Sequence, residues 1–419
     1  MGRKRPAPGP YANHDSRVPR SRSLSSETGL TRVVADLMAA ERESCELLLA
    51  VARYPDSGQT ERIRTLGAKV SDWDALLRLA ESHRMLPLLY RRLADADAAA
   101  PAHIQERLVA EYRRSACQNL ANAAELIAVL QVLERAGIPA MPFKGVVLAA
   151  SAYKDLMARP GGDLDILIHL EDLPRAMPLL FERGYQPMRE SGVEGMTAPP
   201  HWYEYPFVRP RDGIVLELRW RLGLVKGRYT GTLGLDWAWR NRRTTLLAGA
   251  VVPDMCPETK LLMLCMHGAK HMWSRLVWVC DVARLIGVSP GLDWKHAKAE
   301  ARRQGLGRSL ALGVLLAHRV AGAPVLRSVL RSFQRDSTAS ALADHFAKNI
   351  LDMPGAVPTG AVPYSIQLLG LRDRVRLFLS WNILRPNERD RATFRLPAPL
   401  YPLYYLVRPL RLFRDRSAR

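Results

Sequence analysis

Three carboxylates have the types and spacing that metal-assisted chemistry needs, beginning with Asp163 and Asp165. They lie in the segment 163–168, whose alternation and β-branched end predict a strand. Residues two apart on a strand point to the same face, about 6–7 Å apart along the backbone. Carboxylates that close repel each other, so we expect a hard cation such as Mg²⁺ to lie between them.

The third carboxylate, Glu217, lies inside the apolar segment 214–220, which is also predicted to be a strand. A glutamate among apolar neighbours is costly unless it has a partner. On a strand beside Asp163 and Asp165 it would complete a two-metal site, in which one ion activates the attacking oxygen and the other steadies the leaving group. We therefore predict that these three acids are the catalytic residues and the ligands of Mg²⁺ or Mn²⁺.

Upstream, Lys144 and Gly145 form a turn between a predicted strand, 140–143, and a predicted helix, 146–156. The free N–H groups of a helix N-terminus favour phosphate, and Lys144 would add a positive charge. Gly145 would let a phosphate approach the backbone. Arg159 precedes the aspartates, and it would bind phosphate or form an ion pair with one of them. We predict nucleotide binding by Lys144, Gly145 and Arg159.

His267, Lys270 and His271 share one face of a predicted helix, because they are three or four residues apart. One interpretation is that this face meets the nucleotide or its acceptor across a cleft between domains. A second is a zinc site, which would need Asp281 to fold back as a third ligand. The third is that both histidines are buried and structural.

Composition allows roughly two or three domains, since the chain has 419 residues and is 48% hydrophobic and 24% charged. Its net charge of +20 attracts polyanions. The basic residues are partly concentrated at the termini, which would attract anionic membranes or nucleic acid, or simply act as solubilising tails.

The five cysteines form no C-x-x-C pair, and no apolar leader precedes residue 32, so a cytoplasmic location is expected. The apolar run 310–316 is too short to span a bilayer, and we predict no transmembrane segment. The apolar, aromatic and basic segment 400–408 leaves open a role at a membrane surface, as a scaffold in polysaccharide or natural-product assembly.

Periodicity divides the chain into four parts: a disordered basic arm (1–30), an N-terminal helical region (31–135), an α/β core (136–250) and a C-terminal helical region (251–419). The fold class is therefore α+β, with a small mixed sheet flanked by helical regions. Helices are expected at 73–93, 104–135 and 171–183, and in the C-terminal region at 261–264, 273–285, 294–304 and 310–318. A hairpin is expected from 205–208 and 214–220, and the Gly161-Gly162 loop is expected to let backbone approach a ligand.

The order of these motifs resembles the nucleotidyltransferase superfamily of the DNA-polymerase-β type, and more narrowly a bacterial family of uncharacterised nucleotidyltransferases. The matching residues within the core are Phe143-Lys144-Gly145, Leu148, Tyr153, Arg159, Asp163-Leu164-Asp165-Ile166-Leu167, Gly184-Tyr185 and Glu217-Leu218-Arg219-Trp220. Outside the core, the matching residues are His83–Leu93, Leu264–His271, Trp273, Leu276, Trp278, Asp281 and Tyr404–Leu412.

The resemblance implies a small mixed-sheet core and transfer of a nucleoside monophosphate from a nucleoside triphosphate (NTP), such as ATP, to an acceptor oxygen. The acceptor would be a small molecule, a glycan intermediate, a peptide or a protein. Two positions depart from the pattern: Val146 follows Gly145 where relatives have Gly or Ser, and Arg219 stands where relatives have His. The alternative is a degenerate member that binds nucleotide or RNA without turnover.

Overall fold

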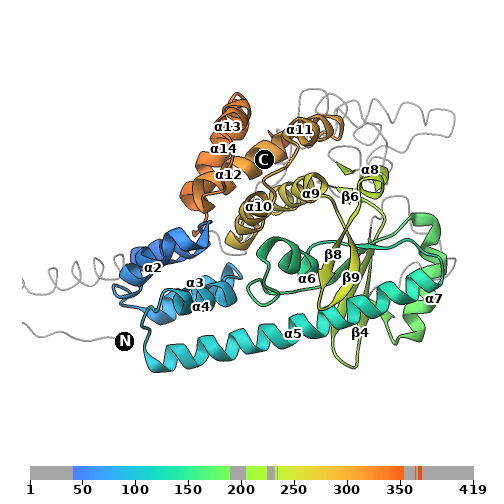
Figure 1. Ribbon diagram of the computed structural model, residues 1–419, viewed down its shortest axis with the longest axis horizontal. Coiled ribbons are helices and arrows are strands. Elements are labelled where there is room, and N and C mark those ends of the chain that lie inside the picture. The colour runs from blue at the N-terminus through green and yellow to red at the C-terminus, as the bar shows by residue number, and fades with distance from the viewer. Residues whose placement is uncertain are drawn as a thin grey trace, which may run out of the picture.

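A computed structural model of the chain describes residues 41–188, 204–223, 232–233, 235–352, 364 and 367–369. Helices surround a five-stranded sheet, and the remaining strands form two two-stranded sheets (Figure 1). The predicted arm 1–30 and the segment 400–408 lie outside the described residues.

The N-terminal region is helical, as expected. Its elements are a helix over residues 41–52, η1 (Asp56–Gln59), α2 (Thr60–Gly67), α3 (Trp73–Ser82), α4 (Leu86–Asp95) and α5 (Ala102–Arg135). The single helix predicted over 73–93 is two helices, because Arg84 adopts a φ of +57° that ends the first. Pro87 in the first turn of α4 is the sequence signal for the second start.

A mixed five-stranded sheet forms the core, in the order β1-β2-β5-β4-β3. Its strands are β1 (Met141–Pro142), β2 (Leu164–Leu167), β3 (Gln186–Pro187), β4 (Glu204–Arg209) and β5 (Ile214–Arg219). β2 and β5 are parallel, and the other pairs are antiparallel. The predicted hairpin is confirmed as β4–β5, and Gly213 in its turn has a φ of +71°.

Two helical segments follow β1, and two more follow β2. The helix predicted over 146–156 is α6 (Gly145–Leu148) continued by a π-helical turn, η2 (Ala149–Tyr153). The helix predicted over 171–183 is η3 (Leu170–Asp172) followed by α7 (Leu173–Glu182). Gly184, just after α7, has the left-handed φ expected at a helix end, +84°.

A second hairpin, β8 (Arg243–Leu247) with β9 (Ala250–Asp254), was not expected from the sequence. Between it and the main sheet lie β6 (Leu222–Gly223), β7 (Thr232–Leu233) and α8 (Leu235–Arg240). The C-terminal helices are α9 (Pro257–Lys270), α10 (Leu276–Val288), α11 (Trp294–Arg303), α12 (Gly307–Ala321), α13 (Arg327–Gln334) and α14 (Ser337–Asn349).

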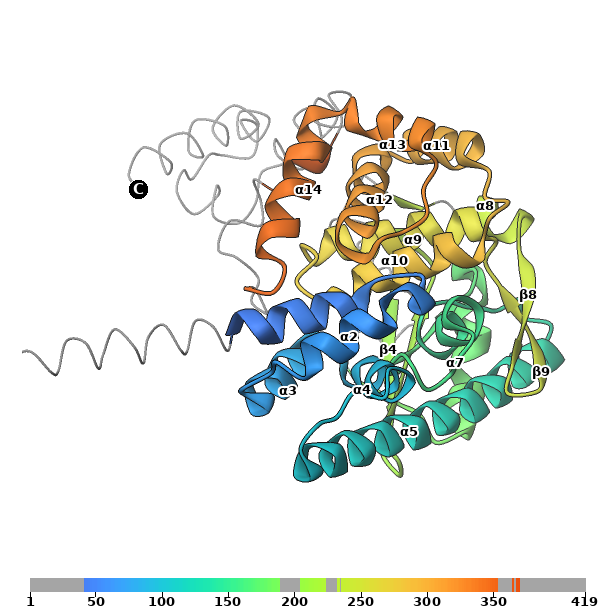
Figure 2. The same cartoon turned by 60° about the vertical axis from the view of Figure 1, so that its left-hand side comes forward.

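Two hydrophobic cores hold the molecule together. One lies between the sheet and the helices α5 and α7, and it contains Leu126, Leu133, Leu164 and Leu216. The other joins the N-terminal helices to α9, α10 and α12. The two helical regions therefore share one core although the sheet separates them in sequence. In Figure 1 the C-terminal helices lie above the sheet, and the N-terminal helices α2, α3 and α4 lie to its left, which Figure 2 shows from another side.

Of the described helices, α5 alone is long and apolar enough by composition to cross a membrane. Its C-terminal half packs in the core beneath the sheet, through residues such as Ala123, Val129 and Leu130. A helix at the core of a globular protein passes the same test of length and composition, so α5 is weak evidence for a span.

Candidate active site

The parallel pairing of β2 and β5 brings the predicted catalytic acids together. Asp165 is the register partner of Glu217 on the neighbouring strand, and Asp163 lies one residue before β2 begins. The prediction that the acids lie on adjacent strands of one small mixed sheet is therefore confirmed for Asp165 and Glu217.

The alternation of the strands decides which face these acids occupy. Leu164, Ile166 and Leu216 point into the core beneath the sheet. Asp165 and Glu217 alternate with them, so they point to the opposite face. This is the face on the same side as the C-terminal helices, away from α5 (Figure 1).

Arg219 lies among the acids. Two residues after Glu217 on β5, it shares the face of that glutamate. Its Nε is 3.0 Å from Asp165 Oδ1, its Nη1 is 2.7 Å from Glu204 Oε2, and its Nη2 donates a hydrogen bond to Glu217 Oε2. Glu204 is the register partner of Arg219 on β4. In the sequence, Arg219 was recognised only as part of a family motif in which it stands where relatives have His, and Glu204 was not predicted to lie at the site.

The cluster has an excess of negative charge. Among the described cations, Lys144 and Arg219 contact three carboxylates, those of Asp165, Glu204 and Glu217. The charge of Arg84 acts on the fourth, Asp163. Burial raises the pKa of Glu217, and burial followed by repulsion from Asp165 raises the pKa of Asp163. Carboxylate oxygens with uncompensated charge are the donors that Mg²⁺ prefers, so the residues present fit a divalent cation in chemistry.

The carboxylate side chains are not arranged around a common point where a divalent cation would bind. Within the described residues, no three His, Cys, Asp or Glu side chains are close enough together to hold a metal. The Arg219 guanidinium contacts both Asp165 and Glu217, so it takes up carboxylate oxygens that a metal would need.

Lys144 forms the edge of the cluster in a strained backbone conformation. Its φ of +65° and ψ of −155° belong to a region almost confined to glycine, which costs on the order of 1–3 kcal/mol. Its Nζ lies 3.4 Å from Asp165 Oδ1, and burial lowers its pKa. Gly145 follows with a φ of +49° against the carbonyl of Asp163. Strain retained at this place is typical of functional turns.

The expected helix dipole at this turn has less structural basis than the sequence suggested. The α-helical part, α6, has only four residues before the π-helical turn begins. The predicted phosphate contact therefore depends on the Lys144 charge and on the backbone N–H groups of the turn.

The loop before β2 is fixed by two buried asparagines of α5, Asn119 and Asn122, which were not predicted from the sequence. Asn119 donates to the carbonyl oxygens of Leu156 and Arg159 at 2.6 and 2.8 Å, and it accepts from the N–H of Gly161 at 2.7 Å. Asn122 donates to the carbonyl of Gly162 at 2.9 Å. Gly161 thus makes room for Asn119, and the expected approach of a ligand to the Gly161-Gly162 backbone stays a prediction.

Gly161→Ala should destabilise the protein. Its Cβ would lie 2.3 Å from Asn119 Oδ1, an atom that the hydrogen bond to the Gly161 N–H already holds in place. Relieving such a clash costs about 1–3 kcal/mol of the free energy of unfolding. The neighbouring Gly162→Ala is the control, because its Cβ would meet only Arg84 at 3.7 Å. Urea unfolding measures both, and equal midpoints would contradict the assignment.

Arg159 is held away from the acids. Its Nε and Nη2 donate to the two carboxylate oxygens of Asp281 on α10 at 2.7 and 2.9 Å, and Tyr153 donates to the same carboxylate at 2.7 Å. The considered ion pair with Asp163 or Asp165 is not formed. The predicted phosphate contact stays a prediction, and it would require the guanidinium to leave Asp281.

His267 and His271 lie at the end of α9 and pack against Trp278, with ring centroids 5.2 Å from it in both cases. Burial and then the charge of Lys144 lower the pKa of His267, and Arg219 contributes too. This electrostatic coupling places the end of α9 near the acid cluster, although substrate contact by His267, Lys270 and His271 stays a prediction. Zinc has no third ligand in Asp281, which is bonded to Arg159 and Tyr153.

Lowering the pH should destabilise the protein through His271. Burial, followed by repulsion from Lys270, lowers its pKa from 6.5 to about 4. Between these two values the unfolded chain binds a proton at His271 that the folded chain does not bind. The contribution of neutral His271 to the free energy of unfolding is therefore complete above pH 6.5 and is lost as the pH falls through 4. Melting temperatures from pH 7.5 to 4 should fall less steeply for His271→Gln than for the unaltered chain. Parallel curves would contradict the assignment.

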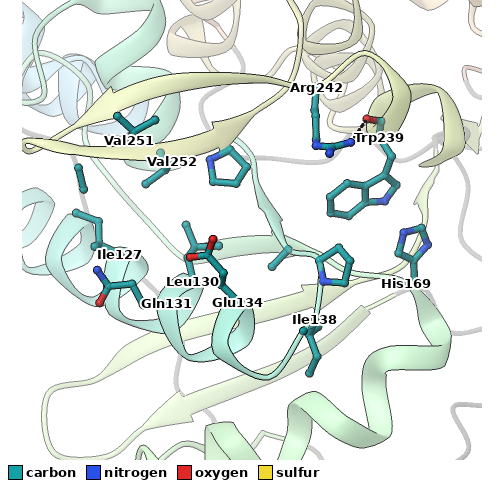
Figure 3. A pocket seen from close by; sticks show the side chains of 15 residues that line it. Ile127, Leu130, Gln131, Glu134, Ile138, His169, Trp239, Arg242, Val251 and Val252 are labelled. Atoms are coloured by element: carbon teal, nitrogen blue, oxygen red, sulfur yellow. Dashed lines mark hydrogen bonds between the residues drawn. The ribbon is translucent and has the colours of Figure 1, made fainter.

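A separate cavity of about 620 Å³ lies at the other end of β2. Ile127, Leu130 and Val252 form apolar walls, and His169 stacks on Trp239 with ring centroids 5.1 Å apart (Figure 3). None of the predicted catalytic or nucleotide-binding residues lines it.

Comparisons with known proteins agree with the sequence motifs. Residues 69–322 match the family "Uncharacterised nucleotidyltransferase", and this range contains every predicted site residue. No curated protein matches the chain at a significant level. A solved structure, an antigenic nucleotidyltransferase-like protein from Paracoccidioides brasiliensis, is similar over 53% of this chain and 92% of its own, with 16% identity and a TM-score of 0.30.

Proposed function

Because the chain belongs to a family of uncharacterised nucleotidyltransferases, we propose that it transfers a nucleoside monophosphate from an NTP to an acceptor hydroxyl with the help of a divalent metal. The observation that carries this proposal is the pairing of Asp165 with Glu217 on adjacent parallel strands, with Asp163 one residue before β2 begins. Hydrolytic chemistry without a metal would leave this concentration of negative charge unexplained.

In the proposed reaction, the acceptor oxygen attacks the α-phosphorus of the NTP. A new P–O bond forms, the bond from the α-phosphorus to the bridging oxygen breaks, and pyrophosphate leaves. Asp163, Asp165 and Glu217 would hold Mg²⁺ or Mn²⁺, which when bound polarises the phosphate and stabilises the leaving group. Lys144 supplies further positive charge to the phosphates. The proton of the acceptor hydroxyl passes to a carboxylate of the cluster, Glu217.

The end of α9 supplies a second wall to the proposed site. His267 and His271 are neutral at pH 7 because their pKa values are lowered. Neutral imidazoles can donate one hydrogen bond and accept another, which suits them to a nucleobase or an acceptor hydroxyl. We assign them, together with Lys270, to substrate contact in this proposal.

The experiment that tests the function uses the full chain with each labelled NTP, Mg²⁺ and a cell extract as the source of acceptors. Pyrophosphate release together with a labelled product supports nucleotidyl transfer. Asp165→Asn run in parallel identifies any activity that comes from the extract alone. Pyrophosphate release equal in both preparations, with no labelled product above that background, would count against the proposal.

One observation favours a second candidate function, which is binding of an NTP without catalytic turnover. Arg219 contacts the oxygens of Asp165 and Glu217 and so neutralises part of the charge that a metal would compensate. If the guanidinium remains there permanently, the site would bind NTP through Lys144 without chemistry. Tight NTP binding in the absence of Mg²⁺, with no product from any NTP, would establish this alternative.

A further inference from the structure

We propose that Arg219 is a displaceable counter-ion that occupies carboxylate oxygens of the metal site, so that a divalent cation binds only by displacing it. The inference rests on the proposed function, because it assumes that the acids hold a metal. It adds to that function a residue that sets metal affinity and the order in which the site fills.

The geometry supports direct competition. Arg219 reaches Asp165 through Nε, Glu217 through Nη2 and Glu204 through Nη1, so one guanidinium spans carboxylates from three strands, β2, β5 and β4. Two of these acids, Asp165 and Glu217, are the proposed metal ligands. A metal and this guanidinium therefore require the same oxygens.

The three contacts of Arg219 differ in kind. Arg219 Nε and Glu204 Oε2 form ion pairs but no hydrogen bond with correct geometry among the described residues. Only the contact with Glu217 is a hydrogen bond in the directional sense. Ion pairs without directional hydrogen bonds hold a side chain less firmly than a bidentate fork would.

The register of the sheet gives the displaced side chain a place to go. Glu204 lies directly across from Arg219 on β4, and it pairs with no other described cation. The Arg219 side chain can therefore keep its contact with Glu204 while it gives up Asp165 and Glu217. A nucleotide phosphate beside Lys144 would be an additional partner, since a guanidinium matches phosphate geometry.

The test measures Mn²⁺ binding, because Mn²⁺ uses the same oxygen ligands as Mg²⁺ and its free form is detected by electron paramagnetic resonance. Charge-assisted contacts are each worth roughly tenfold or more in an equilibrium constant. Arg219→Gln should therefore bind Mn²⁺ at least about tenfold more tightly than the unaltered chain.

Arg219→Lys distinguishes displacement from a simple effect of charge. Lysine keeps the positive charge, but its single ammonium group cannot span three carboxylates. Direct competition predicts that Arg219→Lys also binds Mn²⁺ more tightly, by several-fold. An Arg219→Lys protein equal to the unaltered chain, with only Arg219→Gln improved, would overturn the proposal. Arg221→Gln is the control, because it removes the same charge from an exposed position. It should change the Mn²⁺ affinity by less than about twofold.

Asp165→Asn separates failure of this inference from failure of the proposed function. If Mn²⁺ binds in a manner that Asp165→Asn abolishes, yet no Arg219 variant binds more tightly, the metal site stands and the role of Arg219 is wrong. If Asp165→Asn leaves Mn²⁺ binding unchanged in every background, the acids are not the metal site, and both proposals fall. Melting temperatures of all variants confirm that each one is folded.

Discussion

Asp165→Asn should abolish nucleotidyl transfer while leaving the fold intact. Asparagine has the shape of aspartate but lacks the charge that would hold a divalent cation beside Glu217. Loss of such a ligand removes several kcal/mol of transition-state stabilisation, so turnover should fall by about a thousandfold or more. Pyrophosphate release with the NTP that yields product measures the effect.

The matched control for this change is Asp212→Asn. Asp212 lies in the turn between β4 and β5, at the end of that hairpin opposite Glu204 and Arg219. The same chemical substitution in the same sheet should leave turnover within about twofold. Circular dichroism and melting temperature establish that both proteins are folded. Turnover by Asp165→Asn at the rate of Asp212→Asn would remove the acid cluster from the mechanism.

Asp281→Asn should cost about 3–5 kcal/mol of the free energy of unfolding. Asp281 is 1% exposed, and it holds both the Arg159 guanidinium and the Tyr153 hydroxyl. Without the carboxylate charge, the guanidinium is left buried among partners that cannot neutralise it, and breaking one half of a buried ion pair is costly. Urea unfolding gives the loss directly.

The double variant Arg159→Met with Asp281→Asn tests the pairing itself. Removing both charges should recover part of the loss, so the two single changes should not add. The alternative role of Arg159, as a phosphate ligand, predicts a different result. Arg159→Met would then also weaken NTP binding, in addition to its effect on stability.

Local patterns in the sequence were sufficient for the elements of the core. The alternation in 163–168 and 214–220 predicted the strands β2 and β5, and it separated Asp165 and Glu217 from their apolar neighbours. Gly184 and Gly213 marked a helix end and a hairpin turn, which the structure confirms through their positive φ angles. These features depend only on residues close in sequence, so they could be predicted from the sequence alone.

Other local features gave weaker signals. The turn that separates α3 from α4 depends on Arg84, a residue type that adopts positive φ only rarely. His83 beside it is buried and accepts a hydrogen bond from the N–H of Leu276. A contact between segments so far apart in sequence overrides the helical periodicity, which by itself favours one continuous helix.

The partners of the site residues were decided by the tertiary structure alone. Asp165 and Glu217 become neighbours because β2 pairs in parallel with β5. In the sequence these two strands are separated by α7, β3 and β4. The same pairing brings Glu204 to Arg219, whereas Arg159 is drawn to Asp281. None of these partners follows from spacing along the chain.

The sequence thus determined which residues could do chemistry and which face of a strand each one would occupy, since a strand repeats every two residues. The two-residue spacing also places Arg219 on the face of Glu217. Only the tertiary structure decided that the guanidinium contacts the acids and that Asn119 fixes the loop before Asp163. Register between distant strands depends on the packing of the whole core, which no local pattern encodes.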